Sequence, residues 1–154
     1  MAMALRREGA LVGLHCCGNT EWSALFDLGL DILSLDVRLS LDAALEDAAA
    51  VRRFLSSGAT LSLGIVPTNL AAAYSISELV DSVEASLRAT LGTAFAGAMQ
   101  RALLTPACGL GMRTVIDGER VFRELREAQR AIRSLAEISE QLPAAAQPSP
   151  EARA

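Results

Sequence analysis

The stretch LVGLHCCGNTEW, residues 11–22, decides the fold because it joins an apolar run to a turn and to the start of a helix. The run ALVGLHCC at 10–17 is rich in strand formers, and GNT then marks a turn. Further apolar runs follow the same scheme, each before a segment with helical periodicity, at 30–37, 59–68 and 101–109. Repeated strand–helix units predict an α/β fold with four βα units and parallel strands joined by helical crossovers.

The helical segments carry start signals in the sequence. We expect Thr20 to cap the first helix, and Ser40 to cap a single second helix that ends at SSG, 56–58. Ser75 and Glu78 have capping-box spacing before the third helix. The apolar positions expected to face the core are Val80, Val83, Leu87 and Leu91 in the third helix, and Phe122, Leu125, Ile132 and Leu135 in the last.

Two architectures compete for these four units: an open doubly wound sheet and part of a TIM barrel. Near-continuous apolar strands predict a sheet covered on both faces. No Gly-x-Gly-x-x-Gly follows any of the four runs, which weakens a nucleotide-binding open sheet. A complete barrel takes about 250 residues for eight units, so four units correspond to half a barrel. We expect this domain over 1–142 and a disordered, low-complexity tail over 143–154.

Composition excludes several classes of partner. The 154-residue chain is 51% hydrophobic, carries a net charge of −4 and has only arginine as its basic residue, apart from one histidine. This acidic balance predicts no nucleic-acid partner, and the apolar runs are too short to span a membrane. Three cysteines are an odd number, and the N-terminus is a poor signal peptide. We therefore expect a cytoplasmic protein whose thiols are ligands, reactive groups or core residues.

A possible metal site follows from strand geometry. Side chains alternate along a strand, so His15 and Cys17 point to one side and Cys16 to the other. Asp36 and Cys108 lie at the carboxyl ends of the second and fourth strands, where sites form in parallel α/β folds. Imidazole, thiolate and carboxylate are ligands that zinc accepts, and they would converge within about 4 Å of one another. The alternatives are that Cys16 is a buried core residue and that Asp36 caps a helix or forms a turn.

Four motifs carry a family resemblance: LHCCGNTEW (14–22), DILSLDV (31–37), GIVPT (64–68) and LLTPACGLGMR (103–113). Over about residues 8–138 the chain resembles the C-terminal half of the cobalamin-independent methionine synthase barrel, within the uroporphyrinogen decarboxylase superfamily. The family's zinc ligands map onto His15, Cys17, Asp36 and Cys108. The sequence departs from the family at Asp36, where methionine synthases have glutamate, and in lacking the N-terminal half of the barrel.

The resemblance implies zinc-dependent methyl transfer to a thiol such as homocysteine, from a folate or a methyl-corrinoid. Four βα units cannot close an eight-stranded barrel, so we expect open edges at the first and last strands and exposed apolar surface. We therefore expect the chain to self-associate, to aggregate or to require a second chain that carries the N-terminal half. Two other functions stay open: a non-catalytic half-barrel or subunit, and a metal-free decarboxylase-like barrel. The segment around Cys108 argues against the decarboxylase, because that chemistry needs no soft ligand.

Overall fold

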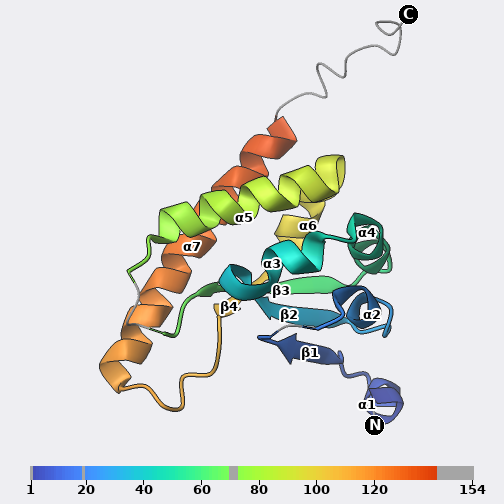
Figure 1. The fold of residues 1–154 in the computed structure, drawn as a ribbon, viewed down its shortest axis with the longest axis horizontal. Helices are drawn as coiled ribbons and strands as arrows, with labels where there is room; N and C mark the ends of the chain where they lie inside the picture. Colours follow the sequence, from blue (N-terminus) through green and yellow to red (C-terminus); the bar gives the residue numbers. More distant parts are fainter. Residues whose placement is uncertain (1, 19, 70–72, 142–154) are drawn as a thin grey trace, which may run out of the picture.

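The computed structural model describes residues 2–18, 20–69 and 73–141, so the tail expected at 143–154 lies outside the described residues. Its centre is a four-stranded, all-parallel sheet in the order β1-β2-β3-β4 (Figure 1). The strands are β1 (Gly13–Cys16), β2 (Ile32–Asp36), β3 (Thr60–Val66) and β4 (Leu103–Pro106). The helices are α1 (Ala2–Arg7), α2 (Trp22–Phe26), α3 (Val37–Leu45), α4 (Ala48–Ser56), α5 (Ile76–Leu91), η1 (Gly92–Ala94), α6 (Phe95–Arg101) and α7 (Val115–Gln141).

The strand order shows how the sheet is wound. A doubly wound sheet reverses direction at a switch point, whereas here each strand lies beside the next one in the chain. Crossovers between parallel strands are right-handed, so a sheet without reversal carries its crossover helices on one face. The helices α3 to α7 gather on one side of β2, β3 and β4 (Figure 1). The α/β class and the four parallel units are thus as the sequence predicts.

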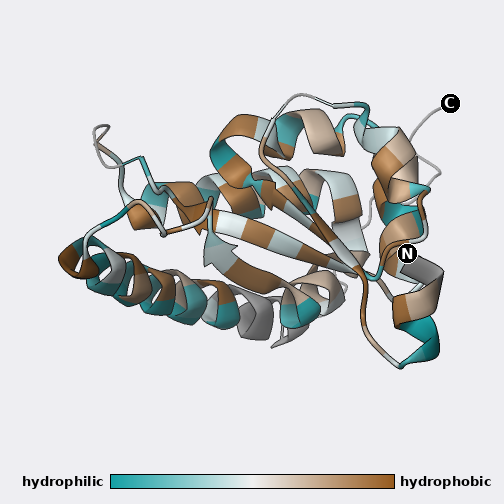
Figure 2. Cartoon of the chain, turned by 90° about the horizontal axis from the view of Figure 1, so that it is seen from below, coloured by the Kyte–Doolittle hydropathy of each residue, from teal (hydrophilic) through white to brown (hydrophobic). Residues whose placement is uncertain are grey.

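Burial confirms that the two faces of the sheet differ. Leu33 and Leu35 in β2 are completely or almost completely buried under the helices, while Ile32, Ser34 and Asp36 on the opposite face are half-buried. The hydropathy view shows strands that alternate between apolar (brown) positions and positions of intermediate hydropathy (white) along their length (Figure 2). The expectation of a sheet covered on both faces holds for β3, in which every residue after Thr60 is buried, but not for β1 and β2. The strands carry one strongly apolar face under the helices, and the second face is more polar, with His15, Ser34 and Ser62 side by side on it.

The helix starts differ from the expected caps in two places. Helix α2 begins after Glu21, without a side-chain capping bond, so Thr20 does not cap it. The single helix expected from Ser40 is two helices, and Ser40 is a buried residue inside α3. Asp36 caps α3 and Asp47 caps α4. Asp36 and Asp47 act as caps because each carboxylate accepts from backbone N–H groups in the first turn of its helix. Ser40 lies inside α3, beyond the position from which a side chain can cap that helix.

The other helical predictions hold more closely. Ser75 caps α5, accepting from the Glu78 N–H at 3.4 Å, and the expected stripe of that helix is buried. Helix α7 forms as expected, with Ile132 buried and Leu125 half-buried against the core, whereas Phe122 is 55% exposed, so its expected core position is wrong. The side chain of Leu135 lies outside the described part of the chain. Helices α1 and α6 are additional to the prediction. Within the described ranges, no helix combines the length and apolar content that a bilayer-spanning segment needs.

Candidate metal centre

The end of β1 supplies two of the donors. In the parallel register His15 lies beside Ser34 of β2, on the face away from the helices, and Cys17 follows directly after the strand. The His15 Nδ1 atom lies 3.0 Å from the Ser34 Oγ atom, which is hydrogen-bonding distance. This bond leaves Nε2 as the ring nitrogen that is free of Ser34. A histidine held through one nitrogen presents the other in a fixed direction, as metal-binding histidines usually do.

The loop after β4 supplies the third donor, and Gly64 sets its path. The pairing of β3 with β4 shifts register between Gly64 and Val66, which bends the strand end. The Ala107 N–H then donates to the Val66 carbonyl at 2.9 Å, and this bond fixes the residue just before Cys108. A Cβ at Gly64 would lie only 2.8 Å from the Ala107 Cα and 2.8 Å from the Leu35 carbonyl oxygen. Only glycine therefore allows the three backbones to approach so closely.

These two segments bring three donors together. One ligand atom each from His15, Cys17 and Cys108 lies within 4.8 Å of the other two. The convergence joins the two outer strands of the sheet, which would be about 14 Å apart in a flat four-stranded sheet. The sheet must therefore curl, and the β4 loop must reach back toward β1. All three side chains are exposed, on the side of the sheet away from the helices.

The donor set fits zinc in chemistry and nearly fits it in spacing. Tetrahedral coordination with ordinary bond lengths places two sulfurs about 3.8 Å apart and a sulfur and a nitrogen about 3.6 Å apart. The three donor atoms lie within 4.8 Å of one another, a longer range than these zinc-site distances and than the distance of about 4 Å expected from the sequence. Rotation of exposed cysteine side chains is enough to close such a difference. The soft sulfur donors favour zinc over magnesium or calcium.

Asp36 binds backbone N–H groups of α3 and does not join the three converging residues. Its Oδ1 atom accepts from the Arg38 N–H at 2.8 Å and from the Leu39 N–H at 3.3 Å, at the N-terminus of α3. Asp36 also lies outside the group of donors that converge. The capping role left open by the sequence is thus the one that the structure shows, and a role for Asp36 as a fourth ligand stays a prediction.

The neighbouring Cys16 points away from the site. Its side chain is half-buried, packs against the hydrophobic core and has its Sγ atom 3.7 Å from the Gly18 carbonyl oxygen. Cys16 lies beside the buried Leu35 in the register, on the helix-covered face. The alternation of side chains along β1 therefore separates Cys16 from Cys17 as the sequence predicts. All three cysteines of the chain are free thiols.

A polar contact joins the segment before α5 to α7. The Tyr74 hydroxyl donates to Glu124 Oε2 at 2.6 Å. Burial of the hydroxyl, and next its bond to the Glu124 carboxylate, raise the pKa of Tyr74 to about 12. Arg120 of the same helix lies 3.8 Å from the other Glu124 oxygen. This contact anchors α7 against the start of α5.

Sequence reasoning missed Ser34 and Gly64. Ser34 is recognisable only once the register places it beside His15. Gly64 carried a readable signal, because an isolated glycine inside a strand pattern indicates a bulge or a close backbone approach.

No protein-family model, curated protein or solved structure gives a significant match to this chain.

Proposed function

We propose that this chain is half of a (β/α)8 barrel of the cobalamin-independent methionine synthase type and that His15, Cys17 and Cys108 bind one zinc ion. The observation that carries the proposal is the convergence of these donors within 4.8 Å from the two outer strands. A closed barrel explains the curl that this convergence requires, because eight strands must bend into a ring. The one-sided helix layer supports the same architecture.

The reaction that suits this site is methyl transfer to a thiol such as homocysteine. Zinc supplies a Lewis acid that favours the deprotonated form of a thiol at neutral pH. In the transfer the thiol loses its proton, its sulfur forms a bond to the methyl carbon, and the bond from that carbon to the donor breaks. The donor is a folate, whose nitrogen keeps the electron pair of the broken bond and takes up a proton, or a methyl-corrinoid, whose cobalt keeps that pair and is reduced from Co(III) to Co(I).

The chain's own residues have separate tasks in this proposal. Cys17 and Cys108 provide thiolate ligands, and His15 provides a neutral nitrogen whose direction is fixed by Ser34. Because all three donors are exposed, a substrate thiol can approach from the open face of the sheet. Reduced ligand thiols require a reducing compartment, which supports a cytoplasmic location.

Metal analysis of the purified chain tests the proposal. We expect one zinc per chain in the wild type and in Cys16→Ser, and loss of zinc in Cys17→Ser and Cys108→Ser. The Cys16 variant is the matched control because it removes a thiol from the same strand end but from the opposite face. Equal zinc content in all four proteins, or none in the wild type, would contradict the assignment.

A second candidate is a non-catalytic half-barrel or subunit that requires a partner chain. The uncovered, largely polar face of the sheet favours it, because a methyl donor would have little to bind on an open surface. Assays with homocysteine and a methylated folate or methyl-corrinoid separate the two. Zinc binding with product formation supports the enzyme, whereas zinc binding without product, even when the partner half is supplied, supports the subunit.

A further inference from the structure

Both outer strands of the sheet leave one edge unpaired. Among the described residues, β1 pairs with β2 alone and β4 with β3 alone, and each of the two edge strands is four residues long. An unpaired edge presents backbone N–H and C=O groups that can pair with another strand. Because all four strands are parallel, β1 of one sheet can pair in parallel with β4 of another sheet and so extend it.

The β1 edge lacks cover on its apolar side. Leu14 lies beside Leu33 in the register and so points toward the helix layer. Leu33 is 0% exposed, whereas Leu14 is 38% exposed. The nearby Leu11 is exposed as well. An edge strand that presents apolar side chains on its helix-facing side requires a helix from elsewhere to cover them.

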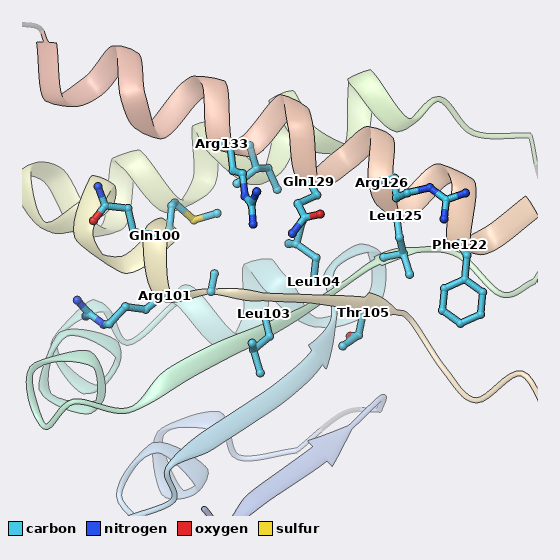
Figure 3. Close-up of a pocket in the computed structure, with 13 residues that line it drawn as sticks. Gln100, Arg101, Leu103, Leu104, Thr105, Phe122, Leu125, Arg126, Gln129 and Arg133 are labelled. Carbon is cyan, nitrogen blue, oxygen red and sulfur yellow. The ribbon is translucent and has the colours of Figure 1, made fainter.

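The β4 edge offers such a helix. A groove of about 870 Å³ runs between β4 and α7 (Figure 3). Its apolar lining includes Leu104, which points from β4 toward α7, together with Phe122, Leu125 and Ile132. Phe122 is 55% exposed there. The groove therefore has the place and the chemistry to receive the helix-facing side of one more parallel strand.

The β4 edge is flanked by basic side chains and the β1 edge by acidic ones. The groove is lined by Arg126 and Arg133 of α7, and both are exposed. The segment that follows β1, residues 20–31, contains three acidic and no basic residues. Glu21 and Asp27 of this segment are exposed beside α2, where Asp27 also pairs with Arg53 of α4 at 3.3 Å, and Asp31 pairs with Arg6 at 3.2 Å. A strand docked in the groove with its own following helix would bring these acidic side chains toward the arginines of α7.

We propose that the partner at these edges is a second copy of this chain. The two copies are related by a two-fold axis parallel to the strands, so that β1 of each pairs with β4 of the other. One chain carries both complementary edges, and a two-fold arrangement therefore satisfies all four edges at once. The product is a closed barrel of eight parallel strands, a number at which side chains fill the interior. The two metal centres lie at the same end of this barrel.

This proposal rests on the barrel architecture proposed above but not on metal binding. The first test is sedimentation equilibrium of the full chain in a chelator and a reducing agent, which exclude metal bridges and disulfides. A species of twice the 16.2 kDa chain mass is expected. A monomer at micromolar concentration, or an open-ended series of larger species, overturns the closed dimer, whatever the zinc content.

Reciprocal charge reversal identifies the interface. One variant carries Arg126→Glu and Arg133→Glu, and the other carries Glu21→Arg and Asp27→Arg. Each alone places like charges at both interfaces and should weaken its dimer at least about tenfold. Mixed together they place opposite charges at both interfaces and should form a heterodimer. Variants that are folded by circular dichroism but fail to associate when mixed would overturn the assignment of these edges.

Apolar substitution gives an independent control. Leu14→Asp should also dissociate the dimer, whereas Leu39→Asp should not, because Leu39 is 68% exposed on α3 and away from β1 and β4. Equal effects of the two substitutions would show that any added charge disrupts association, and would overturn the docking of β1 in the groove.

Discussion

Ser34→Ala should weaken zinc binding while leaving the three donors in place. The Ser34 Oγ atom lies 3.0 Å from the His15 Nδ1 atom, and it is the side-chain partner that fixes the ring. Without it the exposed imidazole can rotate and can carry its proton on Nε2, the nitrogen that Ser34 leaves free for a metal in the proposed site. The substitution removes one oxygen from the half-buried, polar face of the sheet, so the fold should tolerate it.

The expected loss of zinc affinity can be estimated from other hydrogen-bond partners of metal-binding histidines. Loss of a hydrogen bond to a metal-binding histidine typically lowers metal affinity about 10- to 100-fold. This range corresponds to about 1.4–2.7 kcal/mol of binding free energy. The exposure of the site places the expected loss toward the lower end, because water can replace part of the lost hydrogen bond.

Competition for zinc with a chromophoric chelator measures the affinity. His15 is the only histidine of the chain, so nitrogen-15 NMR of the imidazole reports its tautomer without ambiguity. In the metal-free wild type we expect the proton mainly on Nδ1, with Ser34 accepting it, and a mixture of tautomers in Ser34→Ala. Ser34→Thr keeps a hydroxyl and should restore most of the affinity.

The matched control is Ser62→Ala on the adjacent strand. Its hydroxyl lies 3.4 Å from the Thr105 Oγ1 atom and is on the same face of the sheet. If Ser62→Ala lowers zinc affinity as much as Ser34→Ala does, the effect comes from general loosening of the sheet. If Ser34→Ala changes neither the affinity nor the tautomer, the positioning role of Ser34 is refuted.

Three further predictions address single residues. Gly64→Ala should destabilise the fold by about 1–3 kcal/mol or more in urea unfolding, because its Cβ meets two backbones at 2.8 Å. Gly118→Ala meets nothing within 4 Å and should be neutral or stabilising, and equal losses would show that the close approach at Gly64 is not the cause. Cys16→Ala should leave zinc stoichiometry unchanged, and loss of zinc would show that the wrong cysteine is assigned to the site. Stability should fall between pH 10 and about 12, because the raised pKa of Tyr74 favours its neutral form in the fold. The only tyrosine should titrate in absorbance near pH 12, and a midpoint near 10 would contradict the burial of its hydroxyl and its bond to Glu124.

The placement of the three donors could be predicted because it depends on local rules. Alternation along β1 puts His15 and Cys17 on one face and Cys16 on the other, and parallel strands present their carboxyl ends at one edge. These rules place the donors at one end of the sheet, but they do not bring the two outer strands together, which depends on the curvature of the sheet. Together with the family resemblance they predicted a group of four donors, of which the structure brings His15, Cys17 and Cys108 together.

The role of Asp36 could not be decided from sequence because two functions need the same residue at the same place. A carboxylate at the end of a strand can bind a metal, and a carboxylate before a helix can accept from its first N–H groups. Here the helix starts directly after the strand, so Asp36 is both the last residue of β2 and the cap of α3. The contact between Ser34 and His15 could not be predicted because it depends on the register between β1 and β2, which the sequence does not specify.

The metal centre and the proposed dimer both depend on the curvature of the sheet, and this links them thermodynamically. A zinc ion bound as proposed would hold the end of β1 against the loop after β4 and would therefore favour the curled sheet. Closure of an eight-stranded barrel requires the same curl in each copy. Two events that select one conformation strengthen each other by the same factor. Zinc should therefore lower the dimer dissociation constant of the wild type, and Cys108→Ser should abolish this effect while keeping its metal-free association. A dissociation constant that zinc does not change would show that the metal site forms equally well on a sheet that is not closed.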